Sequence, residues 1–437
     1  MPVSVEQALD LQYLLQLGQR PPVAVVPARI ASVLLRQEIH ILRKPFAAAD
    51  IGCSVHGPLP AGLADMERES GGQRQHVVAQ TVGAAVAVEV LKGGRAGEFR
   101  DGAYPSGDAV LPLYAVGDRK RVVPVRSMMQ QADARKGNQV DIITSPRSTG
   151  SILKPFLYAA MLHDGQLLPG TLVPDVPLNL NGFSPQNYNK TFYGAVPAHR
   201  AIERSLNVPL VRMLSTYNTG RFMSLLKKMG MTTLRFSEEH YGASLILGGA
   251  EGTLWDLTGM YASLARTLAH YRIYNGRYNP ADIHPLTPFP ASPTDPVRSV
   301  TDKRLTDKPL LSAASIWFTF EAMSALNRPE EEADWQQFGS MKQVAWKTGT
   351  SYGGRDAWAI GTTPRYTVGV WVGNASGEGR PGLTGVGNAA PVLFDLFSLL
   401  PGSGWFDMPY DELLPTAVCH LSGHKASAIC NRVDTLY

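Results

Sequence analysis

The stretch STGSILKPFLYAAMLHDG, residues 148–165, decides how the rest of the chain is interpreted. Within it, Ser151 and Lys154 stand three residues apart, between a Gly-containing approach and an apolar run that stops at Gly165. Ser is favoured at the start of a helix, Pro155 is tolerated in a first turn, and Gly is a common stop. Residues three apart share a helix face, so the Lys154 amine can reach the Ser151 hydroxyl. The stretch predicts a helix that begins near Ser151 and carries a nucleophile beside a base.

The Ser-x-x-Lys spacing alone does not identify a site, because it occurs three times in the chain. Ser224 and Lys227 stand in the helix-like run RFMSLLKKMG, and Ser422 and Lys425 stand near the C-terminus. For an isolated match of this kind, a capping or surface Ser next to a solvated Lys is the commoner explanation. We interpret these two pairs in that way.

The Ser151 stretch differs because two further motifs follow it in order. Residues 205–207 are Ser-Leu-Asn, and residues 347–349 are Lys-Thr-Gly, which occurs once in the chain. Ser-x-x-Lys, Ser-x-Asn and Lys-Thr-Gly in this order are the signature set of penicillin-binding proteins and serine β-lactamases. Three ordered matches predict a single acyl-transfer site.

Length and composition are those of an ordinary globular protein. The chain has 437 residues, of which 44% are hydrophobic and 18% charged, enough for two or three domains or one large one. A net charge of +4 gives no reason to expect nucleic acid as a partner. We find no apolar run near the roughly 18 residues that span a bilayer, and no signal peptide at the N-terminus. We therefore expect no export or membrane segment in this chain.

The three cysteines are unevenly placed, with Cys53 alone and Cys419 close to Cys430. His420 and His424 lie between the last two, yet the spacing matches none of the usual zinc patterns. A disulfide that closes a short loop is the favoured interpretation, and a pair of free thiols is the alternative. We expect no metal site and no cofactor.

The chain from residue 138 onward predicts a mixture of helices and an antiparallel sheet. Three runs rich in Trp, Val, Ile and Thr, joined by short turns, predict a meander with Lys347 on its first strand. Ser205 and Asn207 fall at a bend between two helices, where polar side chains can project into a cleft. The expected strands are 139–143, 344–350, 357–362 and 366–374, and the expected helices are 198–204, 208–217, 221–229, 252–271, 312–326 and 389–400, with a surface loop over 275–307.

Residues 1–137 differ from the rest in composition. They contain five aromatic residues, whereas all seven tryptophans lie after position 250. A segment so poor in large side chains struggles to offset the entropy lost on ordering. We also find no sustained helical or strand period in it. We therefore expect low order over much of this region.

In its motifs the chain resembles the transpeptidase domain of class A penicillin-binding proteins, most closely the 1C type. The resemblance covers about 138–400 and rests on SPRSTGSILKPFLYA, RSLNVPLVR, YGASLILGGAEGTLWDLTGMYASLA and KTGTSYGGRDAWAIG. It implies an α+β fold of the penicillin-binding protein and serine β-lactamase type. In this fold helices and a helical subdomain flank an antiparallel sheet, and the active site lies between them. Residues 401–437 look like the start of a C-terminal domain that is truncated here.

The resemblance implies roles for the first two motifs. Ser151 would attack the carbonyl between the last two D-alanines of a peptidoglycan stem peptide, and the acyl group would then pass to an amine on a neighbouring stem. Lys154 would take the Ser151 proton, provided that burial and the charge of Lys347 lower its pKa. Ser205 would relay a proton to the leaving or entering amine, and Asn207 would hold the substrate amide.

The resemblance also implies how the third motif binds substrate. Lys347, Thr348 and Thr350 would hold the substrate carboxylate, and Gly349 would leave room for the substrate backbone. The backbone N–H groups of Ser151 and Thr350 would form the oxyanion hole. The expected partners are stem peptides, β-lactam antibiotics and, by family, the cell-wall synthesis machinery, in the periplasm or at the inner membrane.

The N-terminal region departs from this family. Class A members carry a membrane anchor and a glycosyltransferase domain before the transpeptidase, and we recognise neither in 1–137. They also enter the sheet through strands similar to VVDN and AYVGN, which residues 75–137 do not supply convincingly. We therefore expect 1–137 to be a truncated, rearranged or frame-shifted remnant. The alternatives to a transpeptidase are a D,D-carboxypeptidase or β-lactamase-type hydrolase, or a non-catalytic relic.

Overall fold

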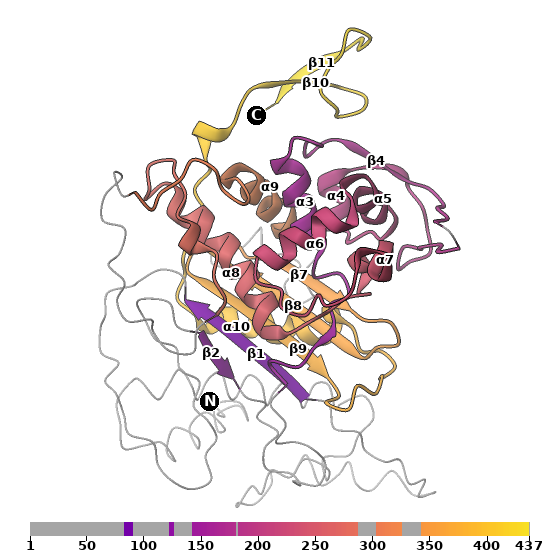
Figure 1. The fold of residues 1–437 in the computed structure, drawn as a ribbon, viewed down its shortest axis with the longest axis vertical. Coiled ribbons are helices and arrows are strands. Elements are labelled where there is room, and N and C mark those ends of the chain that lie inside the picture. The colour runs from indigo at the N-terminus through magenta and orange to yellow at the C-terminus, as the bar shows by residue number, and fades with distance from the viewer. Residues whose placement is uncertain are drawn as a thin grey trace, which may run out of the picture.

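A five-stranded antiparallel sheet with helices on both faces forms the centre of the structure (Figure 1). The computed structural model describes residues 142–180, 182–286, 303–325 and 342–436, together with the backbone of two strands at 83–90 and 122–125. A second group of helices lies beyond the sheet and carries the Ser-Leu-Asn motif between two of its members.

The elements follow one another in a mixed order along the chain. The strands are β1 (Gly83–Val90), β2 (Val122–Val125), β3 (Arg147–Ser148), β4 (Leu172–Asp175), β5 (Gly194–Pro197), β6 (Glu251–Gly252), β7 (Ala345–Thr350), β8 (Asp356–Thr362), β9 (Tyr366–Gly373), β10 (Thr416–Cys419) and β11 (Val433–Leu436). The α-helices are α3 (Lys154–His163), α4 (Ala198–Glu203), α5 (Val208–Tyr217), α6 (Thr219–Lys228), α7 (Glu238–Tyr241), α8 (Leu254–Tyr271), α9 (Ala313–Ser324) and α10 (Ala390–Leu399).

The predicted meander is confirmed, with each strand within one residue of its expected bounds. In the central sheet the strand order is β2-β1-β9-β8-β7, and all neighbours are antiparallel. Strand β7, which carries Lys347, is therefore at the edge of the sheet as the structure describes it. This position leaves one side of β7 free to face the helices that carry the other motifs.

Two strands that we did not expect complete this sheet. Strand β1 pairs with β9 along its whole length, from Gly83 opposite Gly373 to Val90 opposite Tyr366, and β2 pairs with β1. The expectation that residues 75–137 supply no strands is therefore wrong. The run GAAVAVEV has few of the residues that mark strands, so its pairing with the Trp- and Val-rich β9 outweighs a weak local signal. The rest of 1–137 lies outside the described residues.

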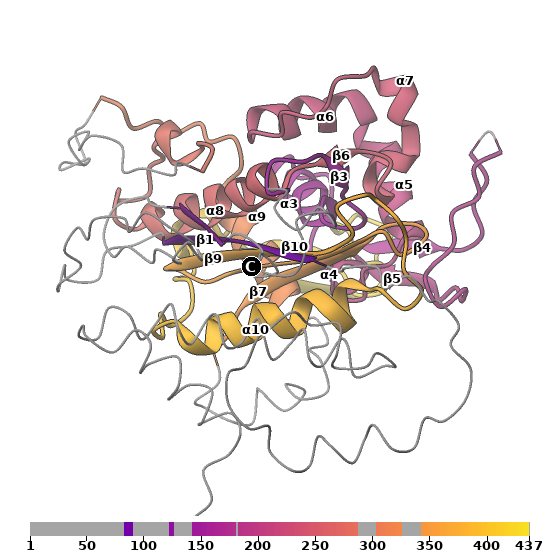
Figure 2. The same cartoon turned by 90° about the horizontal axis from the view of Figure 1, so that it is seen from below.

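The sheet is buried on both faces, which explains the near-continuous apolar runs of β8 and β9. Figure 2 shows α10 below the sheet and α8 and α9 above it, in agreement with their contacts. Trp346 on β7 packs edge-on against Phe394 of α10, with ring centroids 5.0 Å apart. On the other side Phe156 of α3 packs against Tyr261 of α8 at 4.9 Å. Helix α3 is thus fixed to the layer that covers the sheet.

The predicted helices are confirmed with small shifts of their ends. Helix α5 has the expected bounds, Val208–Tyr217, and α8 begins at Leu254 rather than at residue 252. Of the expected strand 139–143, residues 139–141 lie outside the described residues, while Ile142 and Ile143 belong to a turn.

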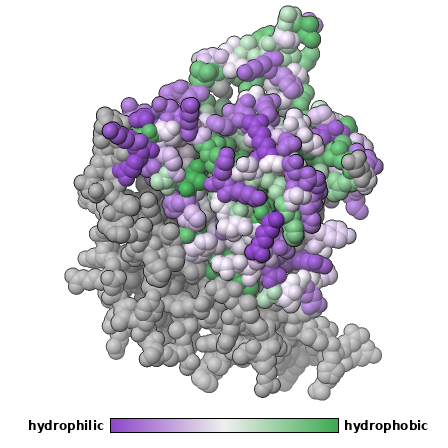
Figure 3. All heavy atoms as spheres, in the orientation of Figure 1, coloured by the Kyte–Doolittle hydropathy of each residue, from purple (hydrophilic) through white to green (hydrophobic). Residues whose placement is uncertain are grey.

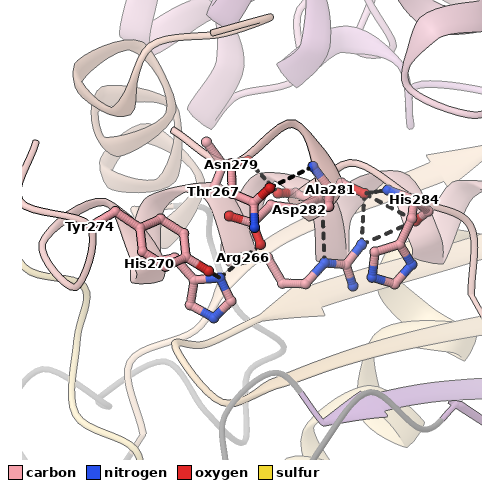
Figure 4. Close-up of polar contacts among 9 residues, drawn as sticks. Arg266, Thr267, His270, Tyr274, Asn279, Ala281, Asp282 and His284 are labelled. Atoms are coloured by element: carbon pink, nitrogen blue, oxygen red, sulfur yellow. Dashed lines mark hydrogen bonds and ion pairs between the residues drawn. The ribbon is translucent and has the colours of Figure 1, made fainter. Parts of the chain in front are cut away.

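A buried arginine fixes the segment after α8 (Figure 4). Arg266 is 1% exposed and donates to the backbone carbonyls of Asp282 and His284 and to the hydroxyl of Ser263. His270, one turn further along α8, lies 2.8 Å from the Asp282 carboxylate. These bonds hold residues 279–286 of the expected 275–307 loop against the helix.

The C-terminal residues form a β10–β11 hairpin that projects from the body of the protein (Figure 1). Its turn is attached to the start of β4 because the Leu172 N–H donates to the Ser422 carbonyl at 2.9 Å. Apolar side chains are present on the surface of this part of the molecule (Figure 3). Between the two strands, Leu421 and Ile429 are 77% and 88% exposed. Residues 401–436 therefore include a hairpin, and the beginning of a truncated C-terminal domain over 401–437 stays a prediction.

The favoured disulfide between Cys419 and Cys430 is not formed, since both cysteines are free thiols in the structure. Hydrogen bonds from Ser422 and from Cys430 lower the pKa of Cys419 to about 7. Among the described residues no cluster of His, Cys, Asp and Glu could hold a metal ion. Within the same residues no helix combines the length and the apolar character that crossing a bilayer requires.

The hydroxyl of Tyr261 connects α8 to the segment after the expected nucleophile. It donates to the Ile152 carbonyl at 2.8 Å in a fully buried position. We predict that Tyr261→Phe lowers the free energy of unfolding by about 1–3 kcal/mol, because it leaves that carbonyl buried without a donor. Urea unfolding measures the loss. Tyr410→Phe, at a position 76% exposed, serves as the control and should cost far less; equal losses would contradict the prediction.

Candidate active site

The Ser151 loop is held from two sides. Strands β3 and β6 pair Ser148 with Glu251, and the Thr149 hydroxyl donates to the Ala250 carbonyl at 3.1 Å. From the sheet, the indole of Trp358 donates to the Ser148 carbonyl at 2.8 Å. The loop before Ser151 is therefore a rigid bridge between the sheet and α8.

Ser151 itself lies in the turn that leads into α3, partly exposed to solvent. The helix begins at Lys154 with Leu153 at its N-cap position, so the prediction that the helix starts near Ser151 is wrong by one turn. Lys154 and Ser151 still lie close, because the Lys154 N–H faces the Ser151 carbonyl at 3.4 Å. In the described residues the Ser151 N–H and hydroxyl have no protein acceptor or donor.

Glycines allow this loop to touch the edge strand β7. A Cβ on Gly150, whose φ is +52°, would lie 2.7 Å from the backbone nitrogen of Thr350. A Cβ on Gly349 would lie 2.6 Å from the Thr149 carbonyl oxygen. No real Cβ makes such contacts, so the absence of side chains at both positions sets the distance between the Ser151 loop and the Lys-Thr-Gly strand.

The register of β7 aims the Thr350 N–H at this loop. Gly349 pairs with Trp358, and two residues further on Ser351 donates to the Asp356 carbonyl at 2.9 Å, as expected of a hydrogen-bonded pair. Paired residues alternate along an antiparallel ladder, so Thr350 turns its N–H and C=O away from β8. The N–H group of Thr350 thus points out from the free edge of the sheet, where the residue before Ser151 lies close to it.

Lys154 is the buried cation nearest Ser151. Its side chain is 0% exposed, and Nζ donates to the Ser205 carbonyl and to Asn207 Oδ1, each at 2.7 Å. Burial, and next the charge of Lys347, hold its pKa well below the usual lysine range. Both causes predicted from the sequence are therefore present. The expected hydrogen bond to the Ser151 hydroxyl is not formed, because these two acceptors orient the amine.

Lys347 reaches the same place from the sheet. It is also 0% exposed, and its Nζ donates to the Ser205 hydroxyl at 2.7 Å and to the Thr348 carbonyl at 2.8 Å. Burial lowers its pKa to about 7. Ser205 therefore contacts both lysines, one through its carbonyl and the other through its hydroxyl, and it links the helical subdomain to the sheet.

The remaining residues of the third motif line the same edge. Thr348 is nearly buried and Thr350 partly exposed. The Thr350 hydroxyl accepts the Gly385 N–H at 2.9 Å, which leaves its own proton available to a ligand. A Cβ on Gly385 would meet the backbone of β7, so this contact also depends on a glycine.

The structure thus brings together all eight residues predicted from the sequence, and it leaves the other two Ser-x-x-Lys pairs outside. Ser224 and Lys227 are exposed on α6, and Lys425 is exposed on the C-terminal hairpin. Two buried polar residues behind the Ser205 loop, Asp175 and Asn187, were not predicted from the sequence. Their only signal was the unusual Asn content of a segment that otherwise showed turn residues.

Comparisons with known proteins agree on one family. A family model described as the penicillin binding protein transpeptidase domain matches residues 124–382. Penicillin-binding protein 1C of Escherichia coli strain K12 is 33% identical over 268 residues, which cover 61% of this chain and 31% of that relative. Penicillin-binding protein 1B of Vibrio cholerae is 26% identical over 265 residues, covering 57% and 31%. The chain therefore spans about 31% of the length of these curated relatives.

Solved structures agree on the fold. The PonA1 protein of Mycobacterium tuberculosis in complex with penicillin V superposes with a TM-score of 0.53 at 16% identity, over 96% of this chain and 97% of that one. Penicillin-binding protein 1A of Haemophilus influenzae gives a TM-score of 0.54 at 16% identity, over 81% and 53%. At such identities the likeness establishes the fold alone, and the predicted α+β fold is confirmed.

The close approach at Gly150 generates a prediction for acylation. Gly150→Ala adds a Cβ that must displace Thr350 or the Ser151 loop, so we expect the rate of reaction with a penicillin to fall by roughly 10- to 100-fold. Stopped-flow or gel-based labelling measures this rate. Gly165→Ala is the matched control, because Gly165 also has a positive φ of +64° but no atom within 4 Å of the added Cβ. Similar rates in the two variants would contradict the prediction.

Burial of Lys347 generates a prediction for stability. Its pKa is about 7 in the folded protein but near 10.4 when unfolded, so between these values the unfolded chain binds more protons and stability rises with pH. The destabilisation that results from burying Lys347 is complete below about pH 7 and absent above about pH 10.4. Lys347→Met should therefore stabilise the fold by roughly 1–4 kcal/mol at pH 7 and by less at pH 10. Denaturant unfolding at both pH values tests this, with Lys227→Met as the exposed control; a gain that does not shrink with pH would refute it.

Proposed function

The chain belongs to the penicillin-binding protein transpeptidase domain family, and we propose that it forms an acyl-enzyme on Ser151 with the D-alanyl-D-alanine end of a peptidoglycan stem peptide. The observation that carries the proposal is the pair of buried lysines, Lys154 and Lys347, which share Ser205 next to Ser151. Burying two cations together is costly, and such strongly perturbed groups are typical of catalytic sites. A domain of this family is a transpeptidase, that is, an acyltransferase.

Lys154 is the proposed general base. A neutral amine has two N–H donors and one lone pair, and the Ser205 carbonyl and Asn207 Oδ1 accept both donors. The lone pair is then left for the proton of the Ser151 hydroxyl. Because burial lowers the pKa of Lys154 and so favours its neutral form, the amine can accept that proton while Ser151 Oγ attacks the substrate carbonyl carbon.

The oxyanion formed by this attack would lie against the N–H groups of Ser151 and Thr350. Both belong to rigid backbone, and the glycine contact at Gly150 keeps them together. Preorganised donors of this kind are worth roughly 3 kcal/mol each in comparable sites. Collapse of the oxyanion breaks the C–N bond, and the leaving D-alanine amine takes a proton through Ser205 and Lys347.

The free carboxylate of the substrate would be bound by Lys347, Thr348 and Thr350. A carboxylate next to Lys347 would favour its ammonium form, and the two opposite charges would pair with each other. The Thr350 hydroxyl, which accepts from Gly385, has its proton free for the carboxylate.

In the second half of the reaction the amine of another stem peptide would attack the acyl-enzyme, and Ser151 would recover its proton. A β-lactam carries a carboxylate and a reactive amide in similar positions, so it would acylate the same serine. By family, the setting would be the periplasmic face of the inner membrane. No cofactor is required, and the acceptor amine and contacts with other cell-wall proteins stay predictions from the resemblance.

Covalent labelling with a fluorescent penicillin tests the nucleophile. We expect the protein to form one adduct in gel and intact-mass assays, and Ser151→Ala to abolish it. Ser224→Ala is the matched control, since it removes a serine with the same Ser-x-x-Lys spacing from the exposed face of α6. Labelling that survives Ser151→Ala, or that is lost in Ser224→Ala, would overturn the assignment.

The fate of the adduct separates the alternatives. An adduct that persists for hours and a stem-peptide product that requires an added amine favour the transpeptidase. Rapid release of hydrolysed penicillin favours the hydrolase. A cooperatively folded protein that takes no label favours the non-catalytic relic.

A further inference from the structure

Asn207 lies at a position where its side chain would ordinarily cap a helix. It is the N-cap residue of α5, and Asn is among the residues most favoured at that position because its side-chain oxygen accepts N–H groups of the first turn. Here the side chain caps nothing in α5, since Oδ1 accepts from Lys154 and Nδ2 donates to the Gln186 carbonyl at 2.8 Å. The start of α5 therefore needs another acceptor.

Asn187 supplies this acceptor from a distant loop. Its Oδ1 accepts the backbone N–H of Asn207 at 2.9 Å and that of Val208 at 3.3 Å. The next residue, Pro209, has no N–H to satisfy. Asn187 thus supplies an acceptor for two N–H groups at the start of α5, while Asn207 Oδ1 accepts from the Lys154 amine instead of from the helix.

The orientation of the Asn187 amide is fixed by its own donors. Its Nδ2 donates to both oxygens of the Asp175 carboxylate, at 2.9 and 3.0 Å, and to the Thr191 carbonyl at 2.9 Å. The Asp175 carboxylate also accepts the Tyr193 N–H at 3.0 Å. Since acceptors take both amide hydrogens, the amide oxygen must face α5. Asp175 and Asn187 are 0% and 2% exposed, so water does not compete with these bonds.

We propose that Asp175 and Asn187 are positioning residues for acyl transfer, which hold the Ser205–Asn207 loop so that its carbonyl and amide oxygens orient the Lys154 amine. Asp175 is the last residue of β4, and β4 packs beside α5. The bonds therefore attach the loop to a strand rather than to a flexible segment. The inference rests on the proposed function, because it assigns a role in the same site.

The loop requires such support because its conformation is strained. Ser205 has a φ of +50°, which residues other than glycine rarely adopt. Its carbonyl nevertheless accepts from Lys154 and its hydroxyl from Lys347. If the Asn187 bonds were lost, α5 could be capped by Asn207 itself, and the Lys154 amine would lose one of its two acceptors.

A charge-preserving exchange of the two residues tests this. In Asp175→Asn two amides face each other, and either Asn187 turns its NH₂ toward the N–H groups of α5 or two donors clash. In Asn187→Asp two carboxylates face each other. The double variant, Asp175→Asn with Asn187→Asp, again joins an amide to a carboxylate and again presents oxygen to α5, although it leaves the Thr191 carbonyl without its donor. Tyr188→Ala, at a position 87% exposed in the same loop, is the control.

The measurement is the reaction with fluorescent penicillin at pH 8, separated into the maximal acylation rate and the half-saturating concentration. We expect each single variant to lower the maximal rate roughly 10- to 100-fold, with a much smaller change in half-saturation. The double variant should recover part of the loss, and Tyr188→Ala should match the parent. Thermal unfolding of each variant accounts for any loss of folded protein.

The outcomes are distinct for the two proposals. If the parent protein is not labelled at Ser151, the proposed function fails. If the parent is labelled, the inference is overturned when folded single variants acylate at the parent rate. It is also overturned when the loss appears only in half-saturation, or when the double variant acylates no faster than the singles.

Discussion

Two lysine side chains buried in one place are the constraint on which the rest of this structure depends. Lys154 and Lys347 have no solvent exposure, and within the described residues neither donates a hydrogen bond to a carboxylate. Neutral oxygens alone satisfy their donors: two backbone carbonyls, one amide and one hydroxyl. Each of these oxygens can accept a hydrogen bond, but none carries a negative charge that would stabilise an ammonium group. The site therefore keeps its amines at depressed pKa, as a general base at neutral pH requires.

The fold meets this constraint by bringing together segments that are far apart in the chain. The edge position of β7 lets Lys347 leave the sheet toward the helices, and the alternation of the ladder turns the Thr350 N–H to the same side. Glycines at Gly150, Gly349 and Gly385 remove the side chains that would keep these backbones apart. Beyond β9 the sheet continues into β1 and β2, whereas β7 is the edge strand on the opposite side in the described part of the chain.

The sequence alone was sufficient to predict the elements and residues that a local pattern identifies. The bounds of α5 and of the three meander strands followed from periodicity and turn residues, and the eight site residues followed from ordered motifs. The predictions from the sequence were wrong where the structure depends on contacts between segments that are far apart in the chain. GAAVAVEV has a weak strand signal, and only its register with β9 makes it β1. Ser151 looked like a helix cap, but it lies in a turn before α3. The residues that lead into this turn are held because Trp358 donates to the Ser148 carbonyl and Thr149 donates to the Ala250 carbonyl.

Asn187 illustrates a more general limit of motif-based prediction. The motif at 205–207 names the residues that contact the lysines, but Asn207 can accept from Lys154 only if something else caps α5. Asn187 supplies an acceptor at the start of α5 instead, and Asp175 fixes the orientation of the Asn187 amide. The contact between Asn207 and Lys154 therefore depends on two residues that belong to none of the three motifs. A side chain beside a helix end is drawn to its N–H groups by default. A catalytic role for Asn207 therefore requires a second residue to supply the cap.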